Sequence, residues 1–273
     1  MLYLERLPHP TLAPFIHSYW YSCDPTAIHS YERILPNGRP QIVLSLARDY
    51  LTNANHPTDP GLPQPAALFL GIYSQYQLID TIDLTELIGI TFHPGGTVPF
   101  FPHNCNIFTN CESSLEELWG RAAWNLRTDL RETSTPERKF NLLDLALRHR
   151  LSESRLPHRT QIVDYALKKI QRSPASTTVN GLARDIGISP RRLSQLFCDQ
   201  IGVSPKTYSR IQRFQQAVQL IHRGVDIHWV ELALNCGYYD QSHFANDFRA
   251  FSGISPTHYS IAQRRWANHI PLD

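Results

Sequence analysis

Short apolar runs separated by Pro, Gly and Asn fill residues 1–112. Runs of this kind, bounded by turn-forming residues, are typical of β-strands. We expect strands at residues 28–35, 41–46, 67–71, 77–82 and 87–91. Many short strands with turn signals favour a sandwich or a barrel, so residues 1–112 are predicted to form a β-rich domain.

The pattern becomes helical in residues 113–151. One amphipathic helix is expected to begin near Ser114 and end near residue 131, and a second begins at Pro136 and ends near residue 150. Residues 152–158 have no periodicity and are predicted to be a linker. The two helices either cover the open face of the β domain or form a dimer interface, and the pattern favours neither.

Residues 159–273 have a helical pattern throughout, with glycines at the breaks. Helices are expected at residues 161–171, 179–185, 190–199, 205–222, 227–235, 241–251 and 256–263.

This last segment repeats itself. Leu182, Ala183 and Gly187 recur 50 residues later as Leu232, Ala233 and Gly237. A second set recurs after 51 residues, in which Leu193, Phe197, Gly202, Ser204, Pro205 and Tyr208 match Phe244, Phe248, Gly253, Ser255, Pro256 and Tyr259. The single added residue falls in a predicted turn, where insertions are tolerated.

Each copy has the pattern of a helix-turn-helix unit. In the first, Gly187 permits the left-handed backbone that ends a helix, Ser189 can cap the next helix and Pro190 occupies its first position. With the apolar residues facing inward, the outward side chains are Arg191, Ser194 and Gln195 in the first unit and Gln241, Ser242, Ala245 and Asn246 in the second. Arg, hydroxyl and amide groups are the side chains that reach base edges in the major groove.

These segments resemble the AraC/XylS family of bacterial transcription regulators. The resemblance is carried by GYYDQSHFANDFRAFSGISPTHY (237–259) and LARDIGISPRRLSQLFCDQIGVSPKTY (182–208), and it covers about residues 160–265. It implies two helix-turn-helix units joined by one long helix (205–222), preceded by a cupin-like β domain that senses a ligand and can dimerise.

The resemblance also assigns roles to residues. The outward residues of both units would contact bases, and Arg192, His243 and Arg249 would contact phosphates. Asn246, Ala250 and Ser260 stand where basic residues are common in the family, so weaker phosphate anchoring is expected from the second unit.

Charge is distributed unevenly along the chain. Residues 1–158 hold 12 Lys or Arg against 16 Asp or Glu, a net charge of −4, and residues 159–273 hold 14 against 8, a net charge of +6. The sum is the overall net charge of +2. A basic C-terminal part is consistent with binding to a polyanion.

Other classes of protein find less support in the sequence. The five cysteines are scattered without a CxxC pair, and GxSxG, HExxH, a phosphate loop and the His-x-His pair of metal-binding cupins are all absent. His103, Cys105 and Cys111 could form a thiol- or metal-sensing cluster. One group of aromatic residues could line a ligand pocket or fill a sandwich core: Tyr19, Trp20, Tyr21, Phe69, Tyr73, Phe92 and Phe100.

The sequence therefore predicts an α+β multidomain protein that regulates transcription by binding specific double-stranded DNA sequences. The N-terminal domain is expected to sense a small molecule or another signal, and RNA polymerase and a second copy of the chain are further candidate partners. We expect no enzyme activity, resident metal, cofactor or membrane partner. Glu5 and Arg6 interrupt the apolar stretch of a signal peptide, so the expected location is the cytoplasm. The alternatives are an enzyme or DNA-repair protein targeted by the helix-turn-helix units, and a thiol- or metal-sensing regulator.

Overall fold

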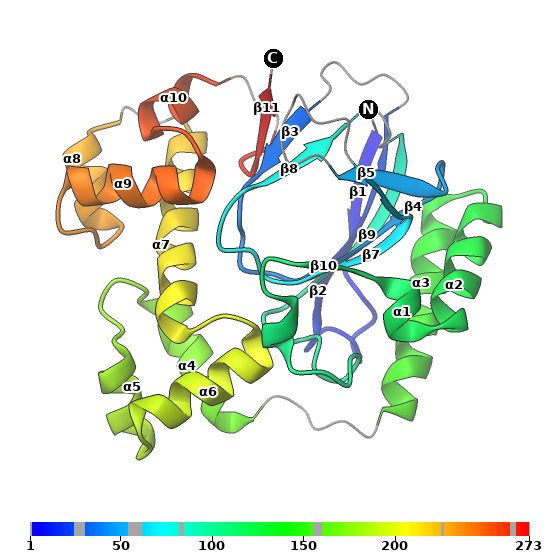
Figure 1. Cartoon of the computed structure of the whole chain (residues 1–273), viewed down its shortest axis with the longest axis horizontal. Helices are drawn as coiled ribbons and strands as arrows, with labels where there is room; N and C mark the ends of the chain where they lie inside the picture. Colours follow the sequence, from blue (N-terminus) through cyan, green and yellow to red (C-terminus); the bar gives the residue numbers. More distant parts are fainter. Residues whose placement is uncertain are drawn as a thin grey trace.

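The computed structural model describes residues 2–24, 31–53, 62–81, 85–154, 160–224, 227–262 and 266–272. A β-rich domain with helices on one side precedes an all-helical domain (Figure 1). This confirms the predicted fold class. The predicted boundaries at residues 112, 151 and 158 stay predictions, and residues 155–158 of the expected linker lie outside the described residues.

Two antiparallel sheets form the β domain. The six-stranded sheet has the order β1-β2-β9-β4-β7-β10, and the five-stranded sheet has the order β11-β3-β8-β5-β6. The strands are β1 (Leu2–Arg6), β2 (Ile16–Cys23), β3 (Tyr31–Ile34), β4 (Gln41–Ser45), β5 (Tyr50–Asn53), β6 (Leu62–Pro65), β7 (Ala67–Leu70), β8 (Gln77–Asp80), β9 (Glu86–Phe92), β10 (Glu112–Ser114) and β11 (His269–Leu272). Leu51 of one sheet packs with Leu68 and Leu87 of the other, so the sheets form a sandwich.

All five expected strands are present as β3, β4, β7, β8 and β9. Residues 28–30 and 82, at the ends of two of them, lie outside the described residues. The pattern of the sequence did not predict the other strands: β1, β2, β5, β6, β10 and β11. Among these, β2 alternates buried Tyr19 and Tyr21 with half-buried Trp20, which is a strand pattern hidden by three consecutive aromatic residues.

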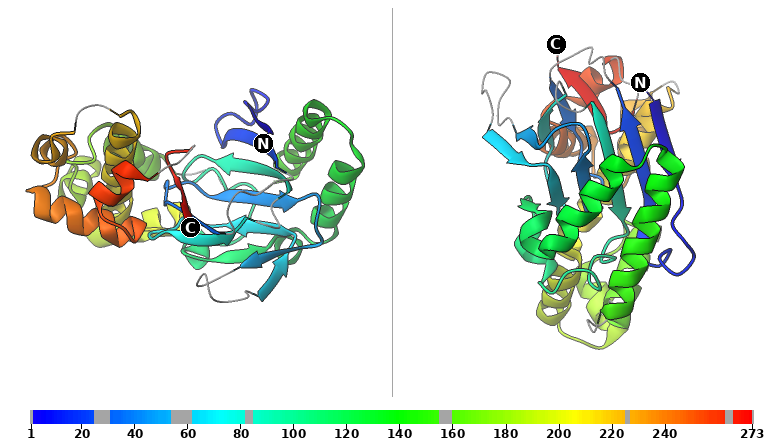
Figure 2. Two further views of the ribbon diagram at one scale, coloured as in Figure 1. Left: turned by 90° about the horizontal axis from the view of Figure 1, so that it is seen from above. Right: turned by 90° about the vertical axis from the view of Figure 1, so that its right-hand side faces the viewer.

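Three helices, not two, follow the β domain: α1 (Leu115–Trp119), α2 (Arg121–Glu132) and α3 (Pro136–Glu153). The expected first helix is interrupted because Gly120 adopts φ 61°, ψ −142°, which a helix cannot contain. α2 and α3 lie on one face of the six-stranded sheet (Figure 2, right). Their buried residues, including Leu130 and Leu143, share a core with the sheet, and the role of the helices, as a cover or as a dimer interface, stays a prediction.

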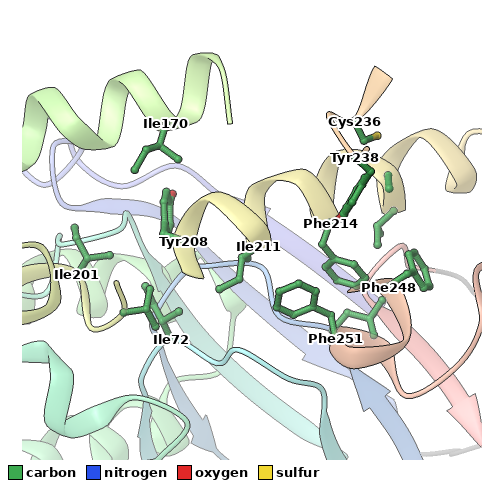
Figure 3. Close-up of a cluster of buried hydrophobic side chains, with 14 of the residues drawn as sticks. Ile72, Ile170, Ile201, Tyr208, Ile211, Phe214, Cys236, Tyr238, Phe248 and Phe251 are labelled. Carbon is green, nitrogen blue, oxygen red and sulfur yellow. The ribbon is translucent and has the colours of Figure 1, made fainter. Parts of the chain in front are cut away.

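The helical domain follows the predicted order. It contains α4 (Gln161–Arg172), α5 (Val179–Ile186), α6 (Pro190–Ile201), α7 (Pro205–His222), α8 (Trp229–Asn235), α9 (Gln241–Ser252) and α10 (Pro256–Ile261). Its core surrounds α7, where Tyr208, Ile211 and Phe214 are buried (Figure 3). Ile72 of the β domain belongs to the same apolar cluster.

The end of the chain departs from the prediction. Residues 269–272 are not helical but form β11, which pairs antiparallel with β3 and so joins the N-terminal sheet (Figure 1). The pairing matches Ile270 with Arg33, and Ile270 is 3% exposed. Separately, no helix in the described ranges has the length and apolar character needed to span a bilayer.

Candidate nucleic-acid interface

The first recognition helix, α6, is fixed at its start by local chemistry. Gly187 closes α5 with φ 78°, ψ 31°, and the Ser189 hydroxyl accepts a hydrogen bond from the Arg192 main-chain N–H at 3.2 Å. Leu193 and Phe197 are fully buried beneath the helix. These anchors determine which side of α6 faces outward.

The predicted base-contacting residues of α6 lie on that outer side. Arg191, Arg192 and Gln195 are exposed, and Ser194 is half-buried. The Gln195 side-chain amide donates to the Asp199 carboxylate at 2.9 Å, one turn further along the same helix. Asp199 therefore restrains the Gln195 side chain, while the second N–H and the carbonyl oxygen of that amide stay available for hydrogen bonds.

The second recognition helix, α9, repeats this arrangement. The Asp240 carboxylate accepts from the His243 main-chain N–H at 2.7 Å, and Phe244 and Phe248 are buried. The predicted DNA-contacting residues occupy the outer side: Gln241, Ser242, His243, Asn246 and Arg249 are exposed, and Ala245 is half-buried.

The internal repeat is also a repeat of structure. Buried Leu182, Leu193 and Phe197 correspond to buried Leu232, Phe244 and Phe248. Ser204 and Ser255 both cap the following helix, and Tyr208 and Tyr259 are both at most 1% exposed. The two units therefore carry their outward faces on equivalent scaffolds.

The structure reveals contacts of α7 that the sequence analysis did not identify. Arg213 donates from Nη1 to the Gly237 main-chain oxygen at 3.0 Å, and its guanidinium lies 4.7 Å from the centre of the Tyr238 ring. Arg210 pairs with Asp247 of α9. One turn before Arg213 on α7, Ser209 donates to the Pro174 main-chain oxygen at 2.6 Å. Spacing alone could not find these contacts because the partners lie 24 to 37 residues apart.

The predicted thiol or metal cluster does not assemble. No group of three His, Cys, Asp or Glu side chains suited to a metal ion occurs among the described residues, which include His103, Cys105 and Cys111. His103 and Cys111 are exposed, whereas Cys105 is half-buried, with its sulfur 3.4 Å from the Thr97 hydroxyl oxygen. Burial raises the pKa of the Cys105 thiol to about 11, which disfavours the reactive thiolate.

Most of the aromatic residues considered for a pocket fill a core instead. Tyr19, Tyr21, Phe69, Phe92 and Phe100 are buried between the six-stranded sheet and its helices. Trp20 points from β2 to the opposite face, over Gly89, where an added Cβ would lie 2.1 Å from the indole. Tyr73 is half-buried and belongs neither to this core nor to the cluster that includes Trp20.

Comparisons with known proteins match the two parts of the chain separately. Residues 182–261 match a family described as a helix-turn-helix domain, and residues 4–114 match a domain of unknown function, DUF6597. The arabinose operon regulatory protein of Escherichia coli is 30% identical over 138 residues, which cover 49% of this chain and 47% of that protein. The chain thus spans about half the length of this relative.

Solved structures are similar as well. A probable AraC family transcriptional regulator from Rhodopseudomonas palustris is 29% identical, with a TM-score of 0.33, over 36% of this chain and 94% of that one. ToxT from Vibrio cholerae is 11% identical, with a TM-score of 0.43, over 95% of this chain and 96% of that one. Residues 182–261 therefore belong to the helix-turn-helix family whose model they match, and the chain is similar in sequence to the arabinose operon regulatory protein.

Proposed function

We propose that the chain is a transcription regulator that binds specific double-stranded DNA sequences by inserting α6 and α9 into the major groove. One observation carries this proposal: two equivalent capped helices each present an exposed polar face, which no described part of the chain covers. Groups of this kind recognise base edges in helix-turn-helix proteins.

The length of α7 supports simultaneous binding by both units. α7 has 18 residues and is therefore about 27 Å long at 1.5 Å per residue. One turn of DNA is about 34 Å, so the two helices can occupy neighbouring stretches of major groove on one face of the duplex.

We assign base contacts to the outward residues of the two helices: Arg191, Ser194, Gln195, Gln241, Ser242, Ala245 and Asn246. Arg192, His243 and Arg249 are assigned to phosphates. Arg191 suits the two acceptors of guanine, and Gln195, Gln241 and Asn246 suit adenine. Because the second unit has no Arg among its base-contacting residues, it should discriminate less and depend more on DNA shape.

The N-terminal domain is proposed to sense a signal. Between the two sheets, Trp20, Val43 and Leu70 form an apolar face that is only partly buried around Leu68 and Leu87. A small apolar effector would bury this face further. RNA polymerase and a second copy of the chain are the other proposed partners, the location is the cytoplasm, and no catalytic step or cofactor is assigned.

Fluorescence anisotropy with a labelled duplex tests DNA binding directly. The full chain should bind, with an affinity that falls steeply as salt rises because phosphate contacts release counterions. The double variant Arg191→Ala/Gln241→Ala should bind more weakly, whereas Arg148→Ala, which removes an exposed arginine from α3, should bind like the wild type. A folded wild type that binds no duplex at low salt would overturn the proposed function.

A further inference from the structure

The β domain contacts both recognition helices at the same point of the repeat. Gly202 directly follows α6 and Gly253 directly follows α9, and these equivalent glycines have left-handed conformations with φ 105° and φ 73°. Each of these C-terminal ends meets a side chain of the β domain, whereas the starts of both helices, including Arg191 and Gln241, are exposed. The DNA-facing residues are thus left uncovered by the β domain.

The contact with the first unit is made by the segment around η1 (Cys105–Phe108). The Thr109 hydroxyl donates a hydrogen bond to the main-chain oxygen of Gly202. A Cβ added at Gly202 would lie 3.2 Å from the Cys105 main-chain oxygen, so the backbones of the two domains approach closely there. Only glycine combines this closeness with the positive φ.

The contact with the second unit is made by Tyr76, directly before β8. Its ring packs on Gly253, where an added Cβ would lie 2.6 Å from Cε1. The Arg33 guanidinium of β3 lies 5.1 Å from the centre of the same ring, so the position of Tyr76 is tied to the five-stranded sheet.

Two further contacts hold the domains together. The Gln215 amide of α7 donates at 2.8 Å to both the Pro36 main-chain oxygen and the Asn268 side chain. Asn268 directly precedes β11, in which Nδ1 of His269 lies 2.8 Å from Oε2 of Glu32 on β3. The five-stranded sheet therefore contains a strand, β11, that comes after the second helix-turn-helix unit in the chain (Figure 2, left).

We infer that the β domain is a brace that sets the relative orientation of the two recognition helices, with Thr109 and Tyr76 as its positioning residues. This brace rests on the proposed function. A change in the five-stranded sheet moves Tyr76 and β11, and so alters the angle of α9 relative to α6 without touching DNA. The brace specifies the spacing between the two DNA contacts, in addition to the spacing that α7 imposes.

Spacing selectivity of the full chain tests the brace. The probes are the duplex that the wild type selects from a randomised pool and the same duplex with one base pair inserted between its two footprinted contacts, which rotates one contact by about a tenth of a turn. The wild type should bind the inserted duplex much more weakly than the original, which gives a high ratio of the Kd for the inserted duplex to the Kd for the original. Tyr76→Ala/Thr109→Ala should reduce that ratio by roughly tenfold, because each unit can then adjust its orientation independently.

Conservative and matched variants separate positioning from general damage. Tyr76→Phe/Thr109→Ser keeps the ring and the hydroxyl, so it should restore the wild-type ratio. Leu7→Ala/Thr128→Ala removes an exposed apolar side chain and a hydroxyl from the N-terminal part outside the five-stranded sheet, and it should leave the ratio unchanged. If the alanine double variant does not fold, the single variants Tyr76→Leu and Thr109→Val should each lower the ratio.

Unchanged spacing selectivity in the folded double variant, or in both single variants, would overturn the brace while leaving DNA binding intact. A wild type that binds no duplex would instead overturn the proposed function, and the brace with it.

Discussion

Arg210 of α7 donates from both Nε and Nη2 to a single carboxylate oxygen, Oδ1 of Asp247 on α9, with the Nε contact at 3.0 Å. The Asp247 side chain is 6% exposed, whereas that of Arg210 is 37% exposed. The guanidinium also lies 5.1 Å from the centre of the Phe251 ring. This pair fastens the second recognition helix to the helix that joins the two units.

Removing the two partners should have unequal costs. Arg210→Met leaves a buried carboxylate without its cation and should lower the free energy of unfolding by roughly 3 kcal/mol. Asp247→Asn leaves Arg210 partly in water and should cost only about 1 kcal/mol. Urea unfolding of the full chain measures both, with the exposed Arg138→Met as a control expected within about 0.5 kcal/mol of wild type. Equal costs, or a larger cost for Asp247→Asn, would contradict this assignment.

The outer surface of α2 and α3 is proposed to mediate self-association. Trp124 is 52% exposed and Leu145 is 65% exposed, although the inner sides of both helices are already buried on the sheet. We expect a dimer at concentrations on the order of 10 μM, and a monomer for Trp124→Glu/Leu145→Glu. Val230→Glu, at a 56% exposed position on α8 of the helical domain, is the control. The full chain is required because a fragment without residues 269–272 would expose the edge of β3. If the wild type sediments as a strict monomer, the proposal that this surface mediates self-association is wrong.

Alkaline pH should destabilise the protein through a buried thiol. Burial in the helical domain raises the pKa of Cys236 from 9.0 to about 11. Between these values the unfolded chain loses its proton and the folded chain keeps it, so the free energy of unfolding falls as pH rises. For Cys236→Ala, the free energy of unfolding should therefore fall less steeply with pH above pH 9.0 than it does for the wild type. Urea unfolding of both proteins over a series of pH values measures this difference. Parallel pH profiles for the two proteins would show that Cys236 does not titrate in this way.

The sequence predicted the helix-turn-helix units well because their determinants are local. Ser189 and Asp240 cap helices within three residues, and Gly187 ends α5 through its own φ angle. These features depend on short-range geometry, so they can be identified without knowing the tertiary fold.

Long-range pairing explains most of what the sequence missed. β11 contains only four residues, one of them Pro271, and its partner β3 lies more than 200 residues earlier. Likewise, nothing near Tyr76 or Thr109 in the sequence indicates that they contact Gly253 and Gly202. A segment of four residues is too short to show a strand pattern by itself, so such a strand becomes evident only from its pairing in the sheet.

Selection of binding sites from a randomised DNA pool tests the central claim, which is sequence reading by the outer faces of α6 and α9. Arg191→Ala should cost roughly 1–3 kcal/mol of binding free energy and relax the preference at one or two adjacent base pairs, with a guanine the expected base. Arg192→Ala should weaken all sequences similarly, lower the salt dependence by about one counterion and leave the selected motif unchanged. Gln241→Ala should change the motif only at the second contact. An unchanged motif with Arg191→Ala together with an altered motif with Arg192→Ala would contradict the assignment of the outward face of α6.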